Sequence, residues 1–208
     1  MRIPPRALLV WCAVLVSVAC TRVVDGAGVP AFPGTLLSGL DVDAILLDQS
    51  RMQAITGGGE RLTIIPSMDG KSPVDIDALA ENAPPQCRFV YAETVTFGPD
   101  IERFHKTTFQ YPPRGGLISE GAAAYRDADT ARHAFDVLVS TVESCSNTPD
   151  GSIYVGDWYA DAQSLHTRPG NCGRDYRLKS MVLMEVTFCG FPESVSDTVI
   201  ANIAANIP

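Results

Sequence analysis

The sequence predicts an α+β fold in which helices pack against an antiparallel β-sheet and two disulfide bonds cross-link the domain. Three observations support this class. Strand-like runs occur in groups of three and four with few helices between them, which favours antiparallel pairing over a parallel βαβ arrangement. Residues 127–145 change to a helical period. Apart from Cys12 in a leader-like segment and Cys20 directly after it, the chain has four cysteines, an even number that is typical of disulfides in exported proteins.

The first element in chain order has the pattern of a secretory leader. Arg2 and Arg6 precede the uncharged run of residues 7–19, which has the length of a signal-peptide core. The run is too short to span a bilayer comfortably, since a spanning helix needs about 20 apolar residues. We therefore expect residues 1–19 to be removed as a signal peptide.

The residues that follow predict a membrane anchor. The small side chains of Ser17, Val18 and Ala19 precede Cys20, in a pattern that is similar to a bacterial lipobox, where the cysteine becomes the acylated first residue. Ser17 stands where lipoboxes prefer Leu, and simple secretion and an uncleaved anchor helix are the alternatives. We expect Cys20 to carry acyl chains such as palmitate, on the outer face of the cell membrane. Residues 20–35 contain glycine and proline without helical or strand periodicity and are expected to form a flexible tether.

The charge balance argues against a nucleic-acid partner. Of the 16 basic residues in the chain, Arg2 and Arg6 belong to the leader, so 14 basic residues face 24 acidic ones in the mature protein and its net charge is near −10. Such a charge repels phosphate backbones and anionic lipid headgroups. The remaining length is ordinary for one globular domain, which we place at residues 36–208.

The cysteine spacing predicts which thiols pair. The stretch "GRDYRLKSMVLMEVTF" between Cys172 and Cys189 contains two strand-like runs around a polar centre, so a hairpin would bring its two ends together. By elimination, Cys87 pairs with Cys145. The sequence has no CxxC pair, which argues against a zinc site or a thioredoxin-like redox centre.

The first half of the domain is predicted to contain two short helices and three strands. Asp41 and Asp48 are candidate N-caps of the helices, and Gly57 is a stop signal. The runs "CRFVYAETVTF" (87–97), "HKTTFQY" (105–111) and "GLISEGAAAY" (116–125) are assigned as antiparallel strands, the first because it is rich in β-branched and aromatic residues.

The second half is predicted to contain a long helix, four strands and a last helix. Residues 127–145 carry an apolar stripe at spacings of three and four, which ends at Cys145 and would bring that thiol to Cys87 at the start of the first strand. The segment "GSIYVGDWYADAQSLHT" (151–167) is assigned as two strands, and the Cys172–Cys189 hairpin adds two more. Residues 193–207 are assigned as a helix.

The sequence shows no motif for catalysis. The three histidines, His105, His133 and His166, fit no metal-binding spacing, and no GxSxG elbow is present. Carboxylates such as Glu93, Glu102, Glu120 and Asp157 could act as acid and base only if the fold paired them. We therefore expect no catalytic residue, no metal and no cofactor, with a cell-envelope hydrolase as the alternative.

A binding domain needs fewer features than an enzyme does: a concave surface, aromatic contact area and a few polar groups. The stretch "DWYAD" places two adjacent rings near a tight turn, and one of them should be core while the other is exposed, because neighbouring strand residues point to opposite faces. We expect a small-molecule or envelope ligand or a protein partner, and a lipid or glycolipid carrier is a further alternative. The candidate ligand-binding residues are Tyr125, Arg126, Trp158, Tyr159 and Arg174.

Three segments give the chain a resemblance to a known family. "PPQCRFVY", "ARHAFDVLVSTVESC" and "NCGRDYRLKSMVLMEVTFCG", the last followed by a helix, resemble the PknH-like extracellular sensor domains of mycobacteria, over about residues 36–208. The resemblance implies an antiparallel sheet backed by helices, two disulfides and a cleft that receives an extracellular ligand. The 208 residues include no kinase catalytic domain, so we expect any signal to pass through ligand capture or a partner protein.

Overall fold

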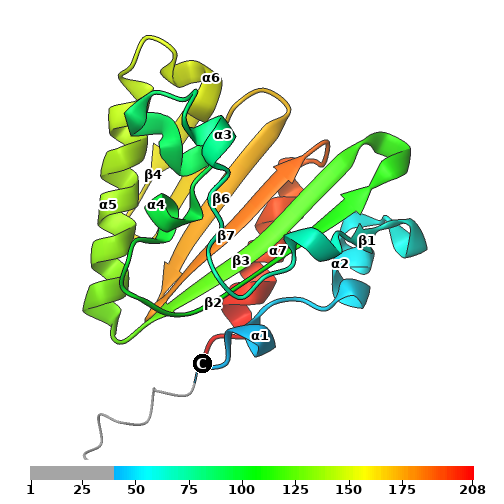
Figure 1. Ribbon diagram of the computed structural model, residues 1–208. Coiled ribbons are helices and arrows are strands. Elements are labelled where there is room, and N and C mark those ends of the chain that lie inside the picture. Colours follow the sequence, from blue (N-terminus) through cyan, green and yellow to red (C-terminus); the bar gives the residue numbers. More distant parts are fainter. Residues whose placement is uncertain (1–39) are drawn as a thin grey trace, which may run out of the picture. The chain divides into compact units, whose positions relative to one another are not determined.

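The computed structural model describes residues 40–208 (Figure 1). The predicted signal peptide, the tether and the predicted lipidation site Cys20 lie outside the described residues. The described chain forms one seven-stranded sheet in the order β1-β2-β3-β7-β6-β5-β4, and all neighbouring strands pair antiparallel. The predicted α+β class with an antiparallel sheet is therefore confirmed. The strands are β1 (Thr63–Ile64), β2 (Ile101–Tyr111), β3 (Gly116–Tyr125), β4 (Asp157–Ala160), β5 (Ser164–Arg168), β6 (Cys172–Lys179) and β7 (Val182–Cys189).

Helices cover both faces of this sheet, and each face has its own hydrophobic core. In Figure 1, α5 runs along one side of the sheet with α3 and α4 in front of it, while α7 lies behind. We call these the α5 face and the α7 face; α1 and α2 contribute to the core of the α7 face. The α-helices are α1 (Val42–Ile45), α2 (Gln49–Thr56), α3 (Asp77–Ala80), α4 (Glu93–Phe97), α5 (Ala128–Ser146), α6 (Gly151–Val155) and α7 (Glu193–Ala205), and the 3₁₀ turns are η1 (Gly59–Arg61), η2 (Pro66–Met68), η3 (Pro85–Val90) and η4 (Pro112–Arg114).

Strand β7 shows how burial on both sides shapes the sequence. Val182, Met184 and Val186 belong to the core of the α7 face, and Leu183 belongs to that of the α5 face. A strand that is covered on both faces has no solvent side to carry polar residues, which explains the nearly continuous apolar run of this central strand.

The two predicted N-terminal helices are present. Asp41 accepts the N–H of Asp43 before α1, and Asp48 accepts the N–H of Arg51 at 2.9 Å before α2. Helix α2 ends at Gly57, whose φ of 66° is the left-handed conformation that glycine adopts at low cost. Local capping signals were therefore sufficient to place both helices.

Helix α5 also follows its prediction closely. Its apolar stripe, which consists of Ala131, Phe135, Leu138, Val142 and Cys145, is buried in the core of the α5 face. The Asp127 carboxylate caps the helix by accepting hydrogen bonds from the Thr130 hydroxyl at 2.6 Å and the Thr130 N–H at 2.7 Å. These two hydrogen bonds, that of the hydroxyl first, hold the pKa of Asp127 below its usual value.

We expect Asp127→Ala to lower the free energy of unfolding, because it leaves the Thr130 N–H in the first turn of α5 without its side-chain acceptor. Urea denaturation of the purified domain measures this change. Asp129→Ala is the matched control, since Asp129 lies in the same turn but is not the cap. Equal losses for the two variants would show that the cap contributes nothing of its own.

The prediction of a strand at residues 87–97 is wrong. These residues form η3 and α4, and the hydroxyl of Thr96 donates to the carbonyl of Phe89 at 2.9 Å, which stabilises the folded-back shape. Phe89 and Phe97 are buried in the core of the α5 face. The aromatic residues that suggested a strand therefore serve packing against a helix, because β-propensity largely measures fit to a half-buried surface.

The segment 151–167 is only partly two strands. Residues 151–155 form α6, and the predicted strand pair is confirmed only from β4 onwards. Gly156 separates them with a φ of 56°, and a Cβ atom at this position would lie 2.0 Å from the carbonyl oxygen of Arg168. Only glycine fits this close approach, which lets the chain leave the helix and enter the edge strand.

Both predicted disulfides are confirmed. Cys172 and Cys189 are direct cross-strand partners on β6 and β7 with Cα atoms 4.1 Å apart. Cys87 and Cys145 join η3 to the last turn of α5, with Cα atoms 4.9 Å apart. Within residues 40–208, no helix has both the length and the hydrophobicity that crossing a membrane requires.

Candidate functional site

The predicted ligand-binding residues are spread over both faces of the sheet. Tyr125 is fully buried and its hydroxyl donates to the carbonyl of Phe97 at 2.7 Å, so this ring presents no surface for a ligand. Burial is the main reason that the pKa of Tyr125 lies above its usual value. Arg126 is exposed next to α5 and hydrogen-bonds Asp127 and Thr130.

Arg174 lies on the α5 face in a network of charges. Its guanidinium donates to Glu185 at 3.0 Å and to the carbonyl of Val90 in η3. Although burial disfavours the charged form of Glu185, Lys106 and Arg174 hold the pKa of this carboxyl below its usual value. Trp158 shares a cross-strand row with Arg174, since Thr167 pairs with both of them. The hydrogen bond from Arg174 to Val90 therefore connects η3 to the sheet.

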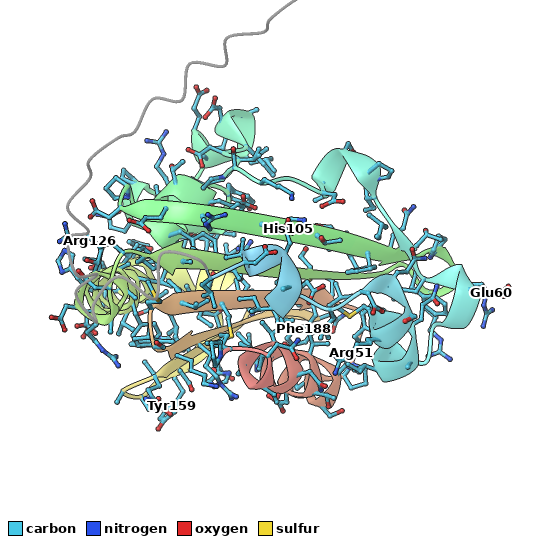
Figure 2. The ribbon with its side chains drawn as sticks, turned by 90° about the horizontal axis from the view of Figure 1, so that it is seen from below. Arg51, Glu60, His105, Arg126, Tyr159 and Phe188 are labelled. Atoms are coloured by element: carbon cyan, nitrogen blue, oxygen red, sulfur yellow. A yellow bond between two sulfur atoms is a disulfide. The ribbon has the colours of Figure 1, made fainter. Side chains whose placement is uncertain are left out.

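Tyr159 points to the opposite face, as the strand alternation predicted. Its side chain is 61% exposed, whereas Trp158 packs against the core of the α5 face. Figure 2 shows the Tyr159 side chain at the rim of the molecule, directed away from the ribbon. The ring stacks on His166, its registered partner on β5, with centroids 6.5 Å apart and planes inclined by 20°.

Tyr159 borders a pocket of about 390 Å³ between β4, β5 and the start of α7. We call it the Tyr159 pocket. The size is within the range of small-ligand sites, and the residues around it combine aromatic rings, an imidazole, a guanidinium and three carboxylates. The lining residues are Asp157, Trp158, Tyr159, His166, Arg168, Glu193 and Asp197.

A buried carboxylate supports the floor of this pocket. Asp175 on β6 is fully buried and receives three groups: the His166 Nδ1 at 2.7 Å, the Arg168 Nη2 at 2.6 Å and the hydroxyl of Ser196 on α7. Burying a carboxylate is costly unless opposite charges and hydrogen bonds satisfy it. The three partners meet this requirement and fix the orientation of the His166 and Arg168 side chains in the pocket wall.

Arg168 is held from several directions. Its Nε lies 3.1 Å from Glu193, its Nη1 donates to the carbonyl of Thr167 at 2.9 Å, and its guanidinium carbon lies 5.3 Å from the centroid of the Phe188 ring. These contacts fix the position of the Arg168 guanidinium, and the carboxylates of Asp175 and Glu193 neutralise its charge. By contrast, Asp157 and Asp197 have no hydrogen bond or ion pair from their side chains to any other residue of the described chain.

Analysis of the sequence named Trp158 and Tyr159, which both line this pocket, and missed most of their neighbours. His166 and Arg168 are two residues apart on a strand and so share a face, a signal that alternation could have revealed. Asp175, Glu193 and Asp197 gave no comparable signal, because they reach the pocket from distant elements.

A second pocket, of about 550 Å³, lies where α1 and α2 meet β2. There the Nδ1 of His105 lies 2.9 Å from Asp43 and its Nε2 lies 2.8 Å from Asp69. Lys71 also bonds Asp43, and this hydrogen bond is the main reason that the pKa of the Asp43 carboxyl is lowered. The Nε2 of His105 hydrogen-bonds Asp69, whereas its buried Nδ1 lies near Asp43 without forming a hydrogen bond to it. Across residues 40–208, no group of His, Cys, Asp and Glu has an arrangement that could hold a metal ion.

Comparisons with known proteins agree with this fold. The model of the family described as "PknH-like extracellular domain" matches residues 37–207. The crystal structure of the extracellular domain of PknH from Mycobacterium tuberculosis matches with a TM-score of 0.60 and 15% sequence identity, covering 78% of this chain and 92% of that chain. A comparison with curated proteins gave no match. Because the family model spans most of the 208 residues, this chain belongs to the family of PknH-like extracellular domains.

Proposed function

We propose that this chain is an extracytoplasmic lipoprotein whose domain binds a small ligand in the Tyr159 pocket without transforming it. One observation carries the proposal: an exposed aromatic ring stands beside the His166 and Arg168 side chains, which a buried carboxylate holds in place. A tyrosine ring offers both apolar contact area and a polar hydroxyl, which is why Tyr is enriched at binding interfaces. Polar groups that are fixed before the ligand arrives lower the entropic cost of binding.

The turn beside Tyr159 adds to this rigidity. The Asp161 carboxylate accepts the N–H groups of Gln163 and Ser164 at 2.7 and 2.8 Å, which closes the link between β4 and β5. The same two hydrogen bonds hold the pKa of Asp161 below its usual value. The edge strand that carries the ring is therefore tied down at its end, which suits a preformed site.

The absence of catalysis is supported by where the reactive groups point. In the described chain the four cysteines are paired as disulfides. The hydroxyl of Ser196 donates to Asp175 rather than to His166, so the histidine has no serine nucleophile to activate. A hydrolase would need such a nucleophile or a positioned water, whereas a binding site needs neither.

The anchor is supported by the leader pattern and by the family. The matched family consists of extracellular domains, and the order of an apolar run, small residues and Cys20 fits export followed by acylation. Acyl chains at Cys20 would keep the domain at the outer surface of the membrane, where a ligand from the envelope or the medium can reach the pocket.

Native mass spectrometry of the protein isolated from its own envelope tests this proposal. We expect a mass that corresponds to a chain starting at an acylated Cys20, with two disulfides and a retained ligand. Four free thiols, or a cytosolic chain with residues 1–19 intact, would contradict the proposal.

The Tyr159→Ala variant tests the location of the site. We expect it to lose the retained ligand while its free energy of unfolding changes by no more than about 0.5 kcal/mol, since an exposed ring on an edge strand contributes little to the core. Thermal denaturation measures the second quantity. A ligand that stays bound to Tyr159→Ala would place the site elsewhere.

A further inference from the structure

The charges that line the Tyr159 pocket do not balance. Arg168 and His166 are both engaged by Asp175, and Arg168 also contacts Glu193. Four carboxylates lie in or directly behind the pocket lining: Asp157, Asp175, Glu193 and Asp197. The cationic groups are Arg168 and, when protonated, His166. The net charge is therefore −2, or −3 when the imidazole is neutral. An anionic ligand would be repelled by this field, and a neutral one would gain nothing from it.

The two acids without a partner reach the pocket from different elements. Asp157 precedes the aromatic pair on β4 and shares a face with Tyr159, and Asp197 lies in the first half of α7. Carboxylates only accept hydrogen bonds, so a group that satisfies both must be a donor. The positively charged groups that donate several hydrogen bonds are ammonium and guanidinium.

The Tyr159 ring supplies a contact that suits the same ligand class. The electron-rich face of an aromatic ring attracts a cation within about 6 Å of its centroid. One face of this ring is stacked on His166, and 61% of the side chain is exposed to solvent. The alkyl carbons of an amine can cover that surface while its charged end meets the carboxylates.

We propose that the Tyr159 pocket binds a small organic cation, an alkylammonium or guanidinium compound, between the Tyr159 ring and the carboxylates of Asp157 and Asp197. This inference rests on the proposed binding function and specifies its ligand class. Glu193 lies at the same rim but is already paired with Arg168, so it contributes less to the attraction.

The test is an NMR titration of the isotopically labelled full-length chain with three probes: butylammonium, butanol as its neutral counterpart, and glucose as a neutral polyol. We expect butylammonium alone to give saturable shifts at the amides of Asp157, Tyr159 and Asp197. The affinity should fall as salt rises from 0.15 M to 1 M, because the screening length shortens from about 8 Å to about 3 Å.

Two variants separate a specific site from general attraction to an acidic protein. Asp157→Asn with Asp197→Asn should weaken butylammonium binding at least about tenfold, since both charges are lost while the shape is kept. Glu60→Gln is the control, because it also removes an acidic charge but lies at the end of the molecule far from Tyr159 in Figure 2. It should leave the affinity unchanged.

The outcomes distinguish this inference from the proposed function. If glucose or butanol shifts the same amides as strongly as butylammonium does, the cation inference is overturned and the binding function stands. Equal binding by the double variant and by Glu60→Gln also overturns the inference. If no probe shifts the pocket and no ligand is retained in native mass spectra, both proposals fail.

Discussion

Replacing Cys87 and Cys145 together by alanine is expected to lower the stability of the domain by about 4 kcal/mol. The bond spans 58 residues of chain, and in the chain-entropy model a loop of this length restricts the unfolded state by about that amount. For a domain of this size, the melting temperature should fall by roughly 8–16 °C.

The position of the bond explains why the neighbouring structure depends on it. Cys87 lies in η3, which has no strand partner and packs on α5. The Val90 carbonyl of the same turn accepts a hydrogen bond from the partly buried guanidinium of Arg174. Loss of the bond therefore frees a segment that otherwise covers charged groups on the α5 face.

Differential scanning calorimetry of three proteins measures the effect. The Cys172→Ala and Cys189→Ala pair should lose less, about 3 kcal/mol, because that loop spans only 17 residues. The surface variant Glu60→Gln should melt within about 2 °C of wild type. A melting temperature near that of wild type for the Cys87 and Cys145 variant would refute the argument.

We expect the domain to be less stable at pH 8 than at pH 5.5, and Glu120 to be the cause. Its side chain on β3 is fully buried, and both carboxyl oxygens lie 3.1 Å from the N–H of Leu47, their hydrogen-bond donor. Burial raises the pKa of Glu120 to about 8; the Leu47 N–H opposes this shift and the charge of Asp48 adds to it. The carboxyl is therefore protonated in the folded protein at neutral pH.

The sign of the effect follows from proton linkage. Between its ordinary pKa of 4.5 and the folded value of about 8, the unfolded chain releases the proton of Glu120 while the folded chain retains it. Each pH unit in this window lowers the free energy of unfolding by up to about 1.4 kcal/mol. Below pH 4.5 the raised pKa of Glu120 makes its full contribution to the stability of the folded state. Above about pH 8 this contribution is lost. The lowered pKa of Glu185 acts in the opposite direction and only at lower pH.

Urea denaturation at several pH values between 5 and 8.5 measures this slope. Glu120→Gln should flatten it, because an amide keeps an acceptor for the Leu47 N–H and does not ionise. The control is Glu81→Gln, which changes an exposed acid and should leave the slope as in wild type. Equal slopes for wild type and Glu120→Gln would show that Glu120 does not control the pH dependence.

The candidate site shows what sequence analysis can and cannot reach. Tyr159 was found because alternation along a strand requires one of two adjacent rings to face outward. Glu193 and Asp197, which give the pocket much of its charge, were missed, since they belong to a helix that packs on the other face of the sheet from the predicted residue Arg174. No local sequence pattern indicates that residues from such distant elements line the same pocket.

The sequence by itself determined the elements whose signals are local. Asp48 and Asp127 cap their helices, the stripe of α5 sets its buried face, and the hairpin spacing pairs Cys172 with Cys189. Only the tertiary structure decided that residues 87–97 fold into η3 and α4. It also decided that Tyr159, Arg168 and Asp197 line one pocket. The physical reason is range: caps and periodicity act between residues a few positions apart, whereas burial and charge pairing depend on which distant surfaces come into contact.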